Sequence, residues 1–194
     1  RHTRYGTVTG SDVCSSDLLT LAIYNEQCEL GYLTGDHETT GQYFNAILTH
    51  ARTPVEKVRA YETQIVMFTA SNQLATAIVL GIEALKSLGM KFPEKASKID
   101  IIRGLVHARW LLRNKTPKDL IDLPEMTEPL KLALAKILMR MTEPSYVENP
   151  DALVVVILKL LALTVTHGNS MYSAFAYVTY GAILCSVFDK YEKG

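Results

Sequence analysis

The sequence predicts an all-α protein built from stacked antiparallel helical hairpins. Between Leu19 and Leu88, apolar residues recur at steps of three and four, which is the spacing of one face of an α-helix. Turn residues interrupt this pattern at short intervals, as expected where one helix ends and the next begins. Residues 151–165 are apolar on nearly every helical face, which indicates a helix buried on most sides.

Four helices are expected within residues 19–89. The turn at residues 34–36 ends the first helix, because Gly35 suits the left-handed conformation that follows a helix. Thr53 is the expected N-cap of the third helix, and Pro54 fits its first turn. The turn at residues 71–72 separates the third helix from the fourth, which Gly89 caps.

Residues 90–150 are expected to form short helices separated by prolines, since six of the seven prolines of the chain lie there. Apolar spacing predicts helices at residues 98–114 and 130–141, with a single helical turn at 119–123. The tetrapeptide Met-Thr-Glu-Pro occurs at residues 126–129 and again at 141–144. Each copy is typical of a helix start, with threonine as the N-cap and an acid in the first turn.

Residues 151–194 predict an apolar helical hairpin. Gly168 is expected to end its first helix, and Asn169 or Ser170 to cap the next one. Residues 188–191 resemble the turn that follows the first helix of a repeat. We therefore expect an incomplete repeat here, in an array truncated at both ends of the chain.

Residues 1–18 show neither a helical nor a strand period. The stretch SDVCSSDL at residues 11–18 resembles a translated sequencing adapter, and a natural disordered tail is the alternative. On either interpretation we expect residues 1–18 to be disordered and to lie outside the fold.

The two hairpins of residues 19–89 are similar to each other at a spacing of 37 residues, which aligns Tyr24 with Tyr61 and Thr40 with Ala77. An aromatic residue in the first helix and a small residue where two helices cross resemble the tetratricopeptide (TPR) repeat. The small residue lets the helices approach, and the aromatic ring fills the adjacent groove. Gly81 departs from the repeat, which has an aromatic residue there. The resemblance implies a TPR-like α–α superhelix.

Composition argues against several classes of protein. The 20 Lys and Arg residues balance the 20 Asp and Glu residues, unlike a strongly basic nucleic-acid-binding module. Three cysteines without CxxC spacing fit neither a disulfide framework nor a zinc site, and indicate a reducing, cytoplasmic location. The two longest apolar stretches, at residues 153–165 and 170–188, are interpreted as buried core helices rather than membrane spans.

We predict no catalytic, cofactor-binding or metal-binding residues in this chain. The histidines have neither HxxxH nor HExxH spacing, and both GxxxxGK[ST] and GxGxxG are absent. Asp151, His167 and Ser170 could be written as a triad, but no nucleophile elbow accompanies Ser170, and capping explains that residue better.

Most of the chain resembles the helical-repeat region of large bacterial signalling proteins. These proteins combine a serine/threonine protein kinase, an AAA-type predicted ATPase, a TPR-like region, and a GAF domain that is often followed by a sensor histidine kinase. The segments that carry the resemblance are YNEQCELGYLTGD (residues 24–36), QYFNAILTHARTPVEKVRAYE (42–62), LPEMTEP (123–129), ENPDAL (148–153) and HGNSMYSAFAYVTYG (167–181).

This resemblance implies a non-catalytic scaffold that binds a protein or peptide. The partners that it implies include the kinase or ATPase domains of the same polypeptide, and ATP and Mg²⁺ would be bound by those domains. The groove-facing residues expected from the repeat register are Asn25, Glu29, Tyr32, Arg59 and Glu62. The alternative is the ligand-sensing repeat domain of a maltose-activator-like transcription regulator, in which a helix-turn-helix would follow.

Overall fold

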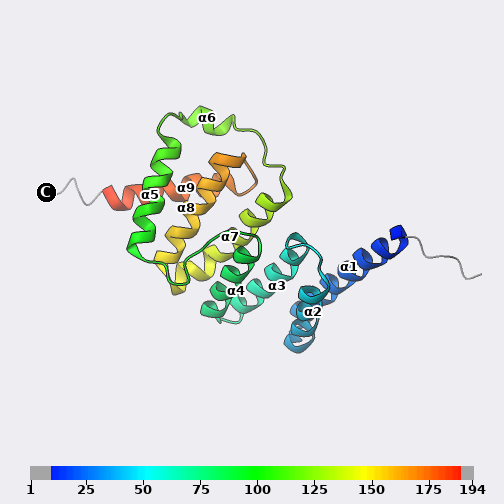
Figure 1. Ribbon diagram of the computed structural model, residues 1–194. Helices are drawn as coiled ribbons and strands as arrows, with labels where there is room; N and C mark the ends of the chain where they lie inside the picture. Colours follow the sequence, from blue (N-terminus) through cyan, green and yellow to red (C-terminus); the bar gives the residue numbers. More distant parts are fainter. Residues whose placement is uncertain (1–9, 189–194) are drawn as a thin grey trace, which may run out of the picture. The chain divides into compact units, whose positions relative to one another are not determined.

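A computed structural model describes the backbone of residues 10–188 and the side chains of residues 19–186. Within these residues the chain forms nine α-helices, one short 3₁₀ helix and no β-strand, which confirms the all-α prediction (Figure 1). The helices are α1 (Gly10–Thr34), α2 (His37–His50), η1 (Val55–Lys57), α3 (Val58–Ala70), α4 (Leu74–Ser87), α5 (Lys98–Leu112), α6 (Pro117–Ile121), α7 (Pro129–Glu148), α8 (Pro150–His167) and α9 (Ser173–Phe188).

Two compact units make up the chain, Arg1–Thr63 and Gln64–Gly194. The boundary lies inside α3, so this division differs from the segments 19–89, 90–150 and 151–194 that the sequence pattern suggests. Each unit has its own cluster of buried apolar residues.

The first unit is centred on the antiparallel pair α1 and α2. Asp36 caps α2 by accepting a hydrogen bond from the Thr39 backbone N–H, and Gly35 has the predicted positive φ of 75°. The two helices cross closely where Gly31 of α1 faces Thr40 of α2. Thr40 is fully buried, and a Cβ on Gly31 would lie only 2.6 Å from its Oγ1. The buried cluster of this unit comprises Leu21, Cys28, Ile47 and Ala60, and Tyr24, Tyr43, Phe44 and Ala51 pack against it.

Helix α1 begins at Gly10, earlier than the helical period of the sequence indicates. The backbone of residues 10–18 is therefore helical where disorder is expected, since a polar segment without Pro can extend an existing helix at small cost. Residues 1–9 lie outside the described residues, and the adapter-like origin of the segment stays a prediction.

The predicted turns around α3 and α4 lie where expected, but Pro54, and not Thr53, occupies the cap position of the helical segment that begins there. Glu56 N–H lies 3.4 Å from Thr53 Oγ1, and Pro54 adopts helical angles at the start of η1, which leads directly into α3. Asn72 has a φ of 56° between α3 and α4, and Gly89 has a φ of 81° after α4. Ala77, the residue aligned with Thr40, is fully buried.

Helix α8 is the central helix of the second unit, where it packs against α5, α7 and α9 (Figure 1). Most of its residues are buried, as its apolar sequence predicts. By length and composition α8 is the one helix among the described residues that could cross a bilayer, and 56% of it is buried inside the protein. That burial accounts for its apolar surface as part of the core.

The prediction of a helix start at residues 141–144 is wrong, because α7 continues through Pro144 to Glu148. Met141 and Pro144 are buried, so tertiary packing offsets the backbone hydrogen bond that proline removes. Thr142 donates to the Met139 carbonyl at 2.6 Å instead of capping a helix. Thr127 is not an N-cap either, since α7 begins at Pro129 with Glu128 in the cap position.

Asn169 joins the turn between α8 and α9 to the segment after α6. Its side chain donates to the Leu120 carbonyl at 2.7 Å and accepts a hydrogen bond from the Tyr177 hydroxyl at 3.1 Å. Its backbone exchanges hydrogen bonds with Pro124 and Met126, both at 2.7 Å. Gly168 ends α8 as predicted, but neither Asn169 nor Ser170 is the N-cap of α9, which begins at Ser173, and Asn169 acts as a tertiary link instead.

Candidate functional site

Two of the five predicted groove residues form an ion pair in the first unit. Arg59 Nε lies 2.7 Å from Glu29 Oε1, and Arg59 Nη2 lies 2.8 Å from Glu26 Oε1. The hydrogen bonds that Arg59 donates to Glu29 and, to a lesser extent, to Glu26 raise the pKa of its guanidinium. Glu26 was not predicted, although its spacing of three residues from Glu29 places both acids on one helix face.

The other three residues differ in exposure. Asn25 and Glu62 are 8% and 6% exposed, so neither presents much surface to a partner. Asn25 donates to the Leu21 carbonyl at 2.8 Å, and its Oδ1 is buried without a hydrogen-bond partner among the described residues. Tyr32 is half-buried. Access from outside is therefore greatest at Arg59, Glu29 and Tyr32.

The triad written from the sequence does not form. Asp151 and His167 lie near opposite ends of α8, which separates their backbones by roughly 24 Å at 1.5 Å per residue. Ser170 Oγ instead accepts a hydrogen bond from the Tyr172 backbone N–H at 3.3 Å. Among the described residues, no group of three or more His, Cys, Asp or Glu side chains is placed to hold a metal ion.

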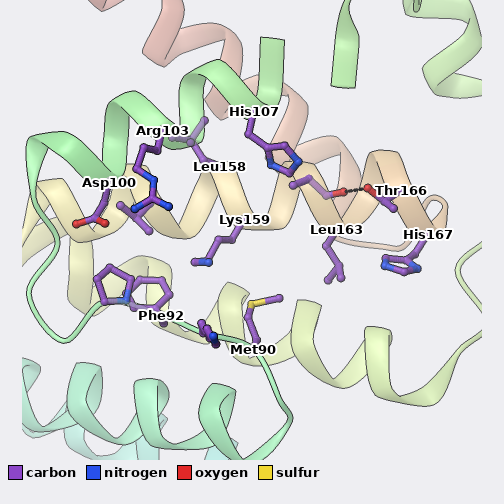
Figure 2. Close-up of a pocket in the computed structure, with 15 residues that line it drawn as sticks. Met90, Phe92, Asp100, Arg103, His107, Leu158, Lys159, Leu163, Thr166 and His167 are labelled. Carbon is purple, nitrogen blue, oxygen red and sulfur yellow. Dashed lines mark hydrogen bonds between the residues drawn. The ribbon is translucent and has the colours of Figure 1, made fainter. Parts of the chain in front are cut away.

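The second unit contains a pocket that the sequence did not predict. It lies between α5, α8 and the segment that links α4 to α5, and its volume is about 700 Å³ (Figure 2). The close approach of α5 to α8 sets its floor, because a Cβ on Gly104 would lie 2.7 Å from Leu158 Cδ1. Gly89, with its positive φ, turns the linking segment so that Phe92 and Pro93 line one side.

Lys159 is the charged residue that α8 contributes to this pocket. Its Nζ lies 5.9 Å from the centre of the Phe92 ring, and Figure 2 shows the side chain extending from α8 toward that ring. Burial lowers the pKa of the Lys159 ammonium, and Asp100 partly opposes that shift. Lys159 forms no hydrogen bond or ion pair with the residues that the structure describes.

Asp100 is the one acidic residue that lines the pocket, and it is already engaged by the start of α5. Its Oδ2 accepts hydrogen bonds from Ser97 Oγ at 2.6 Å and from the Ser97 backbone N–H at 3.1 Å, which forms a capping box. Hydrogen bonding by Ser97 lowers the pKa of Asp100, and the charges of Arg103 and Lys159 contribute in the same direction. Asp100 therefore remains a carboxylate that serves the helix end.

The rest of the lining combines further nitrogen groups with an apolar wall. In Figure 2, Arg103 and His107 project from α5, and His167 lies at the C-terminal end of α8. Lys91 adds a third basic side chain to those of Arg103 and Lys159. The apolar residues of the wall include Met90, Phe92, Val155, Leu158 and Leu163.

The chemistry of this pocket suits binding rather than covalent catalysis. Its lining holds no cysteine or serine, and the Thr166 hydroxyl donates to the Ala162 carbonyl at 2.7 Å. Positively charged groups above an apolar wall can hold an anionic ligand. The sequence signal for the pocket was Lys159, a single charge within an apolar helix, but the lining residues from α5 and the segment before it lie more than 50 residues away along the chain.

No protein-family model, curated protein or solved structure matches this chain.

Proposed function

We propose that the chain is a non-catalytic, TPR-like scaffold that binds a protein or peptide. The observation that supports this most is the packing of helices in adjacent pairs with small, fully buried residues at equivalent positions, Thr40 and Ala77. Such pairs cannot bury their apolar faces alone, so repeats of this kind stack into arrays whose exposed faces bind partners.

Further support comes from the aligned aromatic residues. Tyr24 packs against Tyr43 with ring centres 5.6 Å apart, and Tyr61 packs edge-on against Phe44 at 5.5 Å. Gly81 departs from the repeat pattern, and Met141 of α7 occupies the space beside it. The space that an aromatic residue fills in the repeat is therefore occupied here by a side chain from another helix of the same unit.

On the sequence resemblance, we propose that this scaffold belongs to a multidomain bacterial signalling protein with protein kinase and ATPase domains. In that setting the partner is one of these domains, and binding would shift the population of active kinase. ATP and Mg²⁺ would be bound by those domains and not by this chain.

The direct test measures binding to the kinase domain encoded in the same reading frame. We expect purified chain and kinase domain to form a complex by calorimetry, and Arg59→Ala to weaken it about fivefold or more, because Arg59 is among the most accessible of the groove residues. Lys118→Ala, on α6 of the second unit, is the matched control and should leave affinity unchanged. Absence of binding, or equal loss in both variants, would contradict the proposal.

The pocket between α5 and α8 favours a second candidate function, the ligand-sensing domain of a maltose-activator-like transcription regulator. The two candidates differ in what the gene encodes downstream. The scaffold predicts a GAF domain and a sensor histidine kinase in frame, whereas the regulator predicts a helix-turn-helix. Sequencing the flanking DNA separates them.

A further inference from the structure

Lys159 has a hydrogen-bonding capacity that the described residues leave unused. An ammonium group carries three donors, and Lys159, which is partly buried, donates none of them to a described residue. The Phe92 ring lies at 5.9 Å and compensates only in part. A ligand that supplies acceptor oxygens would satisfy these donors.

The charges of the lining favour an anionic ligand. Lys91, Arg103 and Lys159 contribute three positive charges, whereas Asp100 contributes one negative charge. Asp100 offsets part of the Lys159 charge, but it forms no ion pair with Lys159, and its Oδ2 accepts the hydrogen bonds of the α5 capping box, so the lining keeps a net positive charge. Arg103 can add a planar pair of donors, a geometry that matches carboxylate and phosphate groups.

The shape and apolar lining of the pocket favour a ligand larger than an inorganic ion. A volume of about 700 Å³ lies within the range of about 300–1,000 Å³ that is typical of small-molecule sites. Phe92, Leu158 and Leu163 offer an apolar wall beside the basic groups. We infer that this pocket binds a small organic anion, in which an oxyanion headgroup contacts Lys159 and Arg103 and an apolar body lies along that wall.

This inference does not depend on the scaffold proposal. The pocket lies within the second unit and consists only of its residues, whereas the predicted groove lies on the first unit. A chain that binds the anion but not the kinase domain would support the pocket and contradict the scaffold. A chain that binds the kinase domain but not the anion would support the scaffold and contradict the pocket.

The test measures ligand binding to the full chain by isothermal titration calorimetry. The probes are octanoate and 2-naphthoate, which join a carboxylate to an aliphatic or an aromatic body. Octanol supplies the apolar body without the charge, and inorganic phosphate supplies an oxyanion without the body. We expect at least one carboxylate probe to bind with one-to-one stoichiometry, and octanol and phosphate to bind at least tenfold more weakly.

Two variants locate the site. Lys159→Met keeps an unbranched side chain of similar length and should weaken binding of the carboxylate probe about tenfold or more, because the charged contact is lost. Lys98→Met removes the same charge from an exposed residue of α5 that does not line the pocket, so its affinity should stay within about twofold of the wild-type value.

Three results would overturn the inference. These are no binding of either carboxylate, binding of octanol as tight as that of octanoate, and unchanged affinity in Lys159→Met. Phosphate binding as tight as that of both carboxylates would also contradict it, because the apolar body would then contribute nothing. Circular dichroism of each variant checks that loss of affinity does not reflect unfolding.

Discussion

At the scale of single residues, Lys159 shows how one charge changes the role of an apolar helix. It is the one charged residue between Asp151 and His167, and it lies on α8, which is otherwise suited to the core. Burial lowers its pKa, so the folded state disfavours its charged form. A residue that destabilises the fold without a compensating partner is a candidate for binding.

Replacement of Lys159 by Met should therefore stabilise the protein at neutral pH. Below the lowered pKa of Lys159, the unfolded chain holds this proton more tightly than the folded chain, which costs the wild type stability. The cost disappears as pH rises through that pKa toward 10.5, the ordinary value of lysine. We expect Lys159→Met to have the greater free energy of unfolding at pH 7, and the difference to narrow at pH 9.5.

Urea denaturation, followed by the fluorescence of the single tryptophan Trp110, measures this difference. Lys98→Met is the control, and its stability should match the wild type at both pH values. Equal stability of Lys159→Met and wild type at pH 7, or a difference that grows with pH, would contradict the account of Lys159.

At the scale of helices, close approach depends on residues without side chains at two crossings. Gly81 brings α4 against Met141 of α7, and Gly104 brings α5 against Leu158 of α8. These contacts join helices that are distant in sequence, so no local pattern reveals them. The sequence marked Gly81 only as a departure from the TPR pattern.

The variant Gly81→Ala tests the α4–α7 crossing. The added Cβ would lie 2.5 Å from Met141 Cγ, and Met141 is itself fully buried. We expect the free energy of unfolding to fall by about 1–3 kcal/mol, as for other overpacked sites. The matched control is Gly41→Ala in α2, where no atom lies within 4 Å of the added Cβ and helix propensity should raise stability by about 0.5–1 kcal/mol. Stabilisation by both changes would show that the crossing is not tight.

Helix ends were predictable where a local conformation marks them. Gly35, Gly89 and Gly168 all have positive φ at the helix ends that the sequence indicates. The prediction failed at Pro144, where burial in α7 outweighs the usual helix-breaking effect of proline. Helix boundaries can therefore be predicted from sequence only where tertiary packing does not override the local preference of the residue.

At the scale of the whole molecule, the sequence predicted the helical class but not which faces meet. On α5, the large apolar residues Ile99, Ile102, Val106 and Trp110 are all more than half exposed, although their spacing resembles a core face. The pocket was likewise hidden, because Phe92, Arg103 and Lys159 come together only through tertiary packing. The predicted groove residues stay a proposal, with Asn25 and Glu62 buried.

Helices α5, α7 and α9 assemble around α8, which carries Lys159 into the pocket. Hydrogen exchange of the full chain, measured by mass spectrometry, tests this arrangement most directly. Buried central helices exchange through the largest openings, so the peptide that covers residues 153–165 should exchange more slowly than any peptide from α1, whose described outer face is exposed. Exchange in that peptide as fast as in α1 would contradict the packing on which the pocket depends.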